Sequence, residues 1–279
     1  MVQHRRFWVV GGDRRQRALG QLLRREGHSV ECRGLEEGPF SLAGLEGTDC
    51  VLLPLPVAGG PGLLNAPLIS QKIPLEAVFQ ALSPGQLLFG GRADGDCQRL
   101  AAERGTSILD YTRREEFAVA NAVPTAEGAV QLALEELDCT IQGARVLVLG
   151  FGRVGTVTAQ RFRALGAEVT VAARRQEALA WARVLGFAPA ALGTEPLEAF
   201  RLVVNTIPAP VLDAARLRRL APDCVVLDLA SSPGGVDWGA AEALGLRAIH
   251  ALSLPGKTAP ETAAAIIRDS IFHMLEERA

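Results

Sequence analysis

The sequence is poor in aromatic residues and has almost no lysine. Aromatic side chains account for 5% of its 279 residues and hydrophobic residues of all kinds for 48%, so Ala, Leu and Val must build most of the core. Lysine occurs only at Lys72 and Lys257, among 29 basic residues. A lysine in a chain that otherwise uses arginine suggests a role for a compact ammonium group, such as anchoring a carboxylate or donating a proton. An ordinary surface position is the alternative for Lys257.

Other absences exclude whole classes of protein. The formal net charge is −2 and no long basic run occurs, which argues against a nucleic-acid partner. No apolar run is long enough to cross a bilayer, and MVQHRRFWVVGGD predicts a strand where a signal peptide would need an apolar region, so we expect a cytoplasmic protein with no membrane partner. The five cysteines lack C-x-x-C spacing, and the four histidines are dispersed. We therefore expect reduced, mostly buried thiols and no metal site.

Residues 143–175 carry the most informative pattern. Gly150, Gly152 and Gly155 form G-x-G-x-x-G between an apolar strand (145–149) and a helix (156–165), and a second strand follows (168–173). The first glycine allows a sharp turn, the second lets a pyrophosphate approach, and the third lets the helix pack closely on the strand. Free N–H groups at the start of the helix, at Arg153 and Val154, then face the phosphates. This context predicts a dinucleotide site; a ligand-free glycine turn is the alternative.

The end of the second strand indicates which nucleotide binds. An NAD site usually places an acid there for the ribose 2′-OH, whereas an NADP site offers arginine. Here the strand runs into Arg174 and Arg175, and Glu168 lies at its opposite end. We therefore expect NADP, with NAD as the alternative, and we add Thr206 and Pro208, at the end of a later strand, to the cofactor-binding candidates.

Strands and helical segments alternate along the chain, which predicts an α/β protein with parallel sheets. The expected strands lie at 7–10, 28–32, 49–53, 86–89, 107–109, 145–149, 168–173, 202–205, 224–227 and 247–250. A second glycine turn, GGDRRQ, lacks the third glycine and indicates a Rossmann-like fold with altered ligand chemistry. We expect two Rossmann-like domains, 1–121 on the substrate side and 122–259 for the dinucleotide, with a C-terminal helix (260–279) that crosses back to the first.

Two connecting segments add candidates. Residues 54–74 are rich in Gly and Pro without a strong period, so we expect a long surface loop, either at the mouth of a site or as a plain connector. Thr125 is the expected N-cap of a helix over 126–137. If that helix bridges the domains, its first turn lies at their cleft, which favours roles for Asn121, Thr125 and Glu127 beside capping and helix-dipole roles.

Seven stretches together resemble the family of the dipicolinate synthase A subunits. They are VVGGDRRQ (9–16), NAVPTAEGA (121–129), LGFGRVG (149–155), AARR (172–175), NTIP (205–208), DLASSPGG (228–235) and LPGKTAPETA (254–263). The resemblance implies oxidation of a dihydrodipicolinate, or of the hydroxytetrahydro compound that loses water to give it, with NAD(P)+ accepting hydride from a CH–CH group. It also implies a flavoprotein-like partner, the B subunit of dipicolinate synthase, in a hetero-oligomer within the mother cell of a sporulating bacterium.

That chemistry requires a flat dicarboxylate to be positioned at the nicotinamide and a proton to be accepted. Two carboxylates need two anchors rich in cations or N–H groups. The substrate-binding candidates are Arg14, Arg15, Ser231, Ser232, Gly234 and Lys257, and the catalytic candidates are Lys257, Ser231, Thr125 and Asn121. We place the Ser231 loop and Lys257 in the cofactor domain. No residue is a convincing general base; His250 lies near the right edge, and water can serve.

Two other functions compete with this interpretation. A 2-hydroxyacid dehydrogenase needs an Arg for the substrate carboxylate and a His–acid pair. The loop that should carry the Arg offers Ser231 and Ser232, which counts against that function. A regulatory, non-catalytic subunit that binds NADP(H) and serves a flavoprotein partner is favoured by the lack of a clear acid or base.

Overall fold

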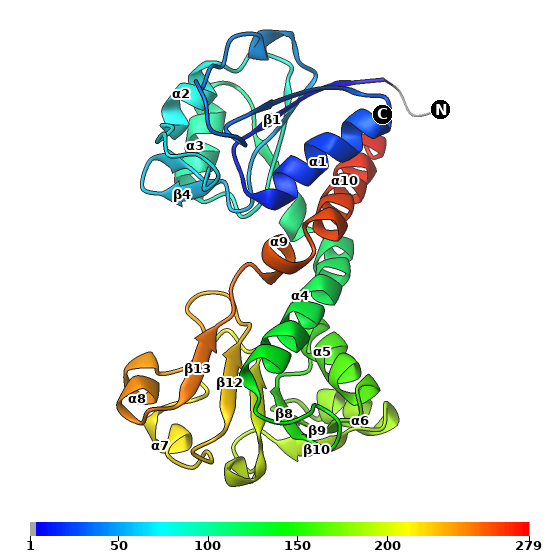
Figure 1. Cartoon of the computed structure of the whole chain (residues 1–279). Coiled ribbons are helices and arrows are strands. Elements are labelled where there is room, and N and C mark those ends of the chain that lie inside the picture. The colour runs from blue at the N-terminus through cyan, green and yellow to red at the C-terminus, as the bar shows by residue number, and fades with distance from the viewer. Residues whose placement is uncertain (1–3, 279) are drawn as a thin grey trace. The chain divides into compact units, whose positions relative to one another are not determined.

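The computed structural model describes residues 4–278, which divide into two compact units (Figure 1). Unit 1 comprises residues up to Ala120 and from Pro255 onward, and unit 2 comprises Asn121–Leu254. Each unit has its own parallel sheet with helices on both faces, as predicted for two Rossmann-like domains. Among the described residues no helix is both long and apolar enough to cross a membrane.

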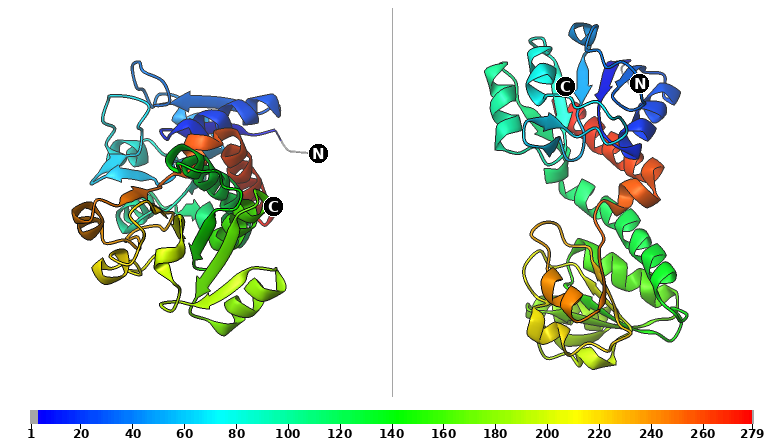
Figure 2. Two further views of the ribbon diagram at one scale, coloured as in Figure 1. Left: turned by 60° about the horizontal axis from the view of Figure 1, so that its bottom comes forward. Right: turned by 60° about the vertical axis from the view of Figure 1, so that its left-hand side comes forward.

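Unit 1 is built on a five-stranded sheet. In pairing order its strands are β2 (Ser29–Arg33), β1 (Arg6–Val10), β3 (Cys50–Leu52), β6 (Leu87–Gly90) and β7 (Ile108–Asp110). Its helices are α1 (Arg14–Arg25), α2 (Leu75–Gln80), α3 (Gly95–Glu103) and α10 (Pro260–Glu276), with 3-10 turns at Leu45–Gly47 and Tyr111–Arg113. Helices α2 and α3 lie on one face of the sheet, and α1 and α10 lie on the other (Figure 2). Each pair shares a hydrophobic core with its face of the sheet. Helix α10 packs on α1, so the chain's last helix returns to unit 1 as predicted.

Unit 2 is built on a six-stranded sheet. In pairing order its strands are β10 (Ala188–Ala191), β9 (Glu168–Ala173), β8 (Arg145–Leu149), β11 (Leu202–Asn205), β12 (Val225–Asp228) and β13 (Arg247–His250). Its helices are α5 (Arg153–Ala164), α6 (Gln176–Val184), α7 (Ala214–Leu217) and α8 (Trp238–Ala243), with a 3-10 turn at Leu197–Ala199. One core lies under α5 and α6 and a second under α7 and α8. The carboxyl ends of the parallel strands therefore gather at one edge, where ligands bind in such sheets.

The expected loop over 54–74 is more structured than the sequence suggested. It contains the antiparallel pair β4 (Ala58–Gly60) and β5 (Leu63–Leu64), and its Val57, Ile69 and Ile73 are buried in the core beneath α2 and α3. The prediction of a long surface loop agrees with the many exposed residues of this segment but missed its strand pair and its buried residues, because the apolar residues follow neither a helical nor a strand period.

The expected helix start at Thr125 was also wrong. Helix α4 (Glu115–Glu136) begins ten residues earlier and runs through Pro124. Thr125 lies in the helix interior, where its hydroxyl donates to the carbonyl of Asn121 at 2.7 Å, a bond that threonine forms with the preceding turn. Because Thr125 and Glu127 both lie in the interior of α4, neither the capping nor the helix-dipole role applies. Glu127 forms an ion pair with Arg161, with 3.3 Å between Oε1 and Nε.

The five cysteines behave as predicted. All are free, and Cys50, Cys97 and Cys224 are buried. Burial raises the pKa of the Cys224 thiol to about 12, which keeps it protonated and unreactive.

Candidate functional site

The glycine-rich turn of unit 2 has the geometry of a nucleotide-binding loop. Gly150 has φ +93°, and a Cβ there would lie 2.5 Å from Thr206 Oγ1. Gly155 has no room for a side chain, because a Cβ would lie 2.3 Å from the Gly150 carbonyl oxygen. Around Gly152, the N-cap of α5, nothing lies within 4 Å of the corresponding position, and this residue has no side chain that could cap the helix. The first and third glycines thus serve the turn and the packing, and the second leaves space for a phosphate at the start of α5.

Thr206 ties this loop to the neighbouring strand end. It follows β11, and its hydroxyl donates to the carbonyl of Leu149, the last residue of β8, at 2.8 Å. Pro208 follows on the exposed surface. Both residues therefore flank the loop at the carboxyl edge of the sheet, where the strand prediction placed them.

Arg174 and Arg175 follow β9 and are exposed. Arg175 Nη1 lies 3.9 Å from Glu177 Oε1, a loose pair in which both side chains are more than two-thirds exposed. Such a pair contributes little and leaves the guanidinium available. Arg175 also borders a groove of about 370 Å³ with Phe151 and Trp181.

The DLASSPGG loop of unit 2 is folded around a buried carboxylate. Asp228, fully buried at the end of β12, accepts hydrogen bonds from Asn205 Nδ2 at 2.8 Å and from the backbone N–H of Gly235 at 2.9 Å. A Cβ at Gly235 would lie 2.2 Å from Asn205 Nδ2, and Gly234 has φ +82°. These contacts explain the aspartate and both glycines as parts of one rigid turn. Ser231 and Ser232 are exposed on it.

The corresponding turn of unit 1 carries its own anion. Asp13 is the N-cap of α1, the position that Gly152 has in α5, and its carboxylate accepts the backbone N–H of Arg15 at 2.9 Å. Gln16 stands where Gly155 stands in unit 2, and its side chain accepts the Asp13 N–H at 3.2 Å. The Asp13 carboxylate thus occupies the place at the start of the helix that a phosphate would need. The turn therefore does not repeat the nucleotide site, in agreement with the altered chemistry that its missing glycine indicated.

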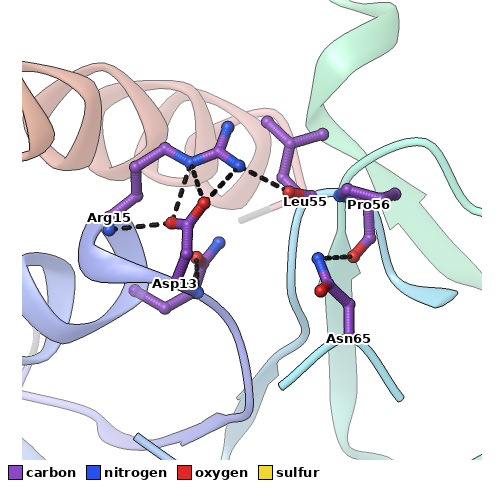
Figure 3. Close-up of polar contacts among 6 residues, drawn as sticks. Asp13, Arg15, Leu55, Pro56 and Asn65 are labelled. Carbon is purple, nitrogen blue, oxygen red and sulfur yellow. Dashed lines mark hydrogen bonds and ion pairs between the residues drawn. The ribbon is translucent and has the colours of Figure 1, made fainter. Parts of the chain in front are cut away.

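Arg15 is held from two sides (Figure 3). Its Nη2 lies 2.8 Å from Asp13 Oδ2 and donates to the Leu55 carbonyl at 2.6 Å. Asn65 lies in the same 54–74 segment as Leu55. Its side-chain Nδ2 donates to the Pro56 carbonyl at 3.0 Å, and its backbone carbonyl accepts the Gly12 N–H at 2.7 Å. The 54–74 segment therefore fixes the GGDRRQ turn.

The LPGKT segment closes on the same turn. It forms α9 (Leu254–Thr258), and a Cβ at Gly256 would lie 2.9 Å from Asp13 Oδ2 and 3.0 Å from Arg15 Nε. Arg14 Nη1 donates to the Lys257 carbonyl at 3.0 Å. Lys257 therefore lies in unit 1 beside Arg14, and its expected place in the cofactor domain was wrong. No local sequence pattern marks Pro255 as the boundary between the units, because the chain passes from unit 2 to unit 1 within the short helix α9.

Two buried polar groups lie behind the Asp13–Arg15 pair. Tyr111 Oη and Gln16 Nε2 are buried, and within the described chain neither has a hydrogen-bond partner. Burial raises the pKa of Tyr111, and the charge of Arg15 opposes that rise. The tyrosine is therefore a neutral hydroxyl at any physiological pH.

The structure adds Arg92, a residue that no sequence motif singled out. Arg92 follows β6 at the carboxyl edge and is exposed. Its φ is +51°, and its N–H donates to Asp110 Oδ1 at 3.3 Å and Thr112 Oγ1 at 3.2 Å. The sequence did contain a signal for Arg92, because it is a polar residue that comes after a predicted strand (86–89) and two glycines.

The structure groups the predicted site residues within each unit. Arg14, Arg15 and Lys257 meet in unit 1, whereas Gly150 to Gly155, Arg174, Arg175, Thr206, Pro208, Ser231, Ser232 and Gly234 lie at strand ends of unit 2. Asn121 and Thr125 lie inside α4. His250 ends β13 and packs against Trp238, with 5.1 Å between ring centroids.

Comparisons with known proteins agree with the motifs found in unit 1 and in unit 2. Residues 6–112 match the family model of the N-terminal domain of dipicolinate synthase A subunits, and residues 111–232 match "D-isomer specific 2-hydroxyacid dehydrogenase, NAD binding domain". The chain is 30% identical to the A subunit of dipicolinate synthase from Bacillus subtilis (strain 168), over 96% of this chain and 95% of that protein. The chain belongs to the family of dipicolinate synthase A subunits.

Solved structures of this family have the same fold. The A subunit from Bacillus halodurans superposes with a TM-score of 0.88 at 30% identity, covering 99% of both chains. The Bacillus subtilis protein gives 0.85 at 29% identity, covering 99% of this chain and 97% of that one. A transhydrogenase from Sinorhizobium meliloti, 17% identical with a TM-score of 0.72 over 97% and 94% of the chains, shares the fold alone. The family and its NAD-binding domain show that the chain is an oxidoreductase that uses a nicotinamide cofactor.

Proposed function

We propose that the chain oxidises a dihydrodipicolinate, formed by loss of water from 4-hydroxy-tetrahydrodipicolinate, to dipicolinate. A CH–CH group of the ring loses a hydride to NADP+ and a proton to a base or to water, which yields dipicolinate, NADPH and a proton. The observation that carries this proposal is the 30% identity to a dipicolinate synthase A subunit across 96% of the chain. The aromatic product makes hydride loss favourable, so the protein must chiefly bind and orient the ring.

The cofactor proposal rests on unit 2. The first turn of α5, at Arg153 and Val154, follows the open space at Gly152 and would bind the pyrophosphate. Arg174 and Arg175 would bind a 2′-phosphate, which favours NADP over NAD. Nicotinamide supplies the hydride acceptor when it is bound.

The substrate proposal rests on cations and N–H groups at the strand ends. Arg14 and Lys257 offer positive charge in unit 1. In unit 2, Ser231 and Ser232 offer exposed hydroxyl groups, whereas the buried Gly234 donates its N–H to the Ser231 carbonyl at 2.9 Å and serves to shape this loop. Arg15 is already paired with Asp13, so its contribution is chiefly to hold the turn. Thr125 donates its proton to Asn121 and can only accept a hydrogen bond, which ranks Lys257 and Ser231 above Thr125 and Asn121 as catalytic candidates.

We further propose that the chain works with a flavoprotein-like second subunit, because the relative is itself named as one subunit of its enzyme, in the cytoplasm of a sporulating mother cell. The test is absorbance at 340 nm after the precursor and NADP+ are added to the chain alone and to the chain with that partner. Reduction by the chain alone supports the proposal most strongly. Nucleotide binding without reduction in either mixture would contradict it and favour a nucleotide-sensing role.

A further inference from the structure

Three cations at the carboxyl edge of the unit 1 sheet lack an acidic partner. Within residues 4–278, Arg14, Lys257 and Arg92 take part in no ion pair, whereas Arg15 pairs with Asp13. Uncompensated cations at a strand-end edge favour an anionic ligand. The first two are adjacent, and Arg92 stands apart from them.

The backbone of Arg92 is unfavourable for an arginine. A φ of +51° costs an L residue about 1 kcal/mol or more, whereas glycine adopts it freely. The conformation is held because the Arg92 N–H donates to Asp110 Oδ1 and Thr112 Oγ1. Gly91 before it packs closely, since a Cβ there would lie 2.6 Å from Leu55 Cδ1. Folding alone would favour glycine at position 92. Strain of this kind is typical of functional sites.

The loops that carry Arg14 and Arg92 follow strands that are close enough for both arginines to reach one ligand with two charges. The pairing order places β3 between β1 and β6, so the loops with Arg14 and Arg92 begin about 10 Å apart. Between them the exposed Pro56 follows β3. Long arginine side chains can approach each other across this proline and hold the two ends of one small, flat ring.

We propose that Arg92 binds one carboxylate of the dicarboxylate substrate and that Arg14 with Lys257 binds the other, an inference that rests on the proposed function. Arg92 then recognises the second carboxylate and so determines specificity for a dicarboxylate over a monocarboxylate. Arg15, paired with Asp13, holds the floor of the site.

The test compares pyridine-2,6-dicarboxylate with pyridine-2-carboxylate by calorimetric titration of the full chain with NADP+ bound. In Arg92→Gly we expect the dicarboxylate affinity to fall about 10-fold or more, because a charge-assisted bond is lost. The monocarboxylate affinity should change less than about threefold, and the melting temperature should not fall, because glycine relieves the backbone strain. Arg25→Gln, at an exposed arginine in the last turn of α1, is the charge-matched control and should match the wild type.

Unchanged dicarboxylate affinity in Arg92→Gly would overturn the inference and leave the proposed function standing. Equal loss for both ligands with a lower melting temperature would also overturn it, because that pattern indicates a structural role. If the wild-type chain binds nucleotide but neither pyridine acid, the inference falls, whereas the proposed function is decided separately by the absorbance assay with and without the partner.

Discussion

Asp13 and Arg15 form a charge pair within the first turn of α1, with 2.8 Å between Oδ2 and Nη2 and only 6% of the Arg15 side chain exposed. The same carboxylate caps the helix, and Gly256 packs directly against the pair. The pair therefore joins the GGDRRQ turn to the LPGKT segment from the other end of the chain. The proposed phosphate site in unit 2 and the self-neutralised turn in unit 1 are built on the same strand-to-helix geometry.

Replacing Asp13 with asparagine should destabilise the protein by about 2–3 kcal/mol in urea unfolding, because a nearly buried guanidinium loses its counter-charge. Asparagine keeps the capping oxygen, so the cap itself changes little. Asp94 caps α3 through the Cys97 N–H at 2.9 Å and is exposed, so Asp94→Asn is the matched control. Equal losses in the two variants would show that the pair adds nothing beyond the cap.

The second and third glycines of the nucleotide loop should respond differently to alanine. Gly155→Ala places a Cβ 2.3 Å from a backbone oxygen, so we expect a loss of about 2 kcal/mol or more in stability together with weaker nucleotide binding. Gly152→Ala has open space on the protein side, so the fold should stay intact while NADPH affinity, measured by fluorescence titration, falls at least about 10-fold. Normal NADPH affinity in Gly152→Ala would argue against phosphate binding at the start of α5.

Nucleotide preference should depend on the arginines after β9. The double variant Arg174→Gln, Arg175→Gln removes two exposed cations, so the Kd for NADP+ should rise about 10-fold or more while the Kd for NAD+ changes less than about threefold. Equal changes for the two nucleotides would indicate that neither arginine binds a 2′-phosphate. Binding titrations with both nucleotides measure this directly.

Stability should fall in mild acid because of His28. Burial lowers the pKa of this histidine below its ordinary 6.5, and its Nδ1 accepts the Arg5 N–H at 3.4 Å. The unfolded chain therefore binds a proton at His28 more readily than the folded chain does. The stability that the neutral His28 contributes is complete above pH 6.5 and is lost as the pH falls from there toward the pKa of the folded state. Urea midpoints across this window should lose part of their pH dependence in His28→Gln and keep it in His250→Gln, at an exposed histidine. An unchanged pH dependence in His28→Gln would refute this cause.

Features that depend on local patterns could be predicted from the sequence. The runs RVLVL, EVTVAA, LVVN and RAIH predicted β8, β9, β11 and β13 with their observed bounds, because short apolar runs between glycines and polar turns mark buried parallel strands. The roles of Gly150 in the turn and of Gly155 in packing also follow from local geometry, and both agree with the contacts at these positions. The role of Gly152 in phosphate binding stays a prediction, for which its surroundings leave open space.

Features that depend on distant contacts could not be predicted. Strand β10, APAA, has no β-branched residue and forms only by pairing with β9. The placement of Lys257 depends on contacts of the LPGKT segment with the first turn of α1, far away in the sequence. Arg92 could have been noticed as a strand-end residue, but its positive φ comes from Asp110 and Thr112.

Isotope transfer can show whether the hydride passes straight from the substrate ring to the nicotinamide. Dihydrodipicolinate deuterated at the ring carbons is oxidised under anaerobic conditions with NADP+ and the chain, and the NADPH formed is analysed by mass spectrometry. We expect one deuterium in each NADPH and equal amounts of NADPH and dipicolinate, because the hydride moves directly between the two rings. Dipicolinate formed without deuterium in the nucleotide would contradict the proposed reaction and show that another group accepts the hydride.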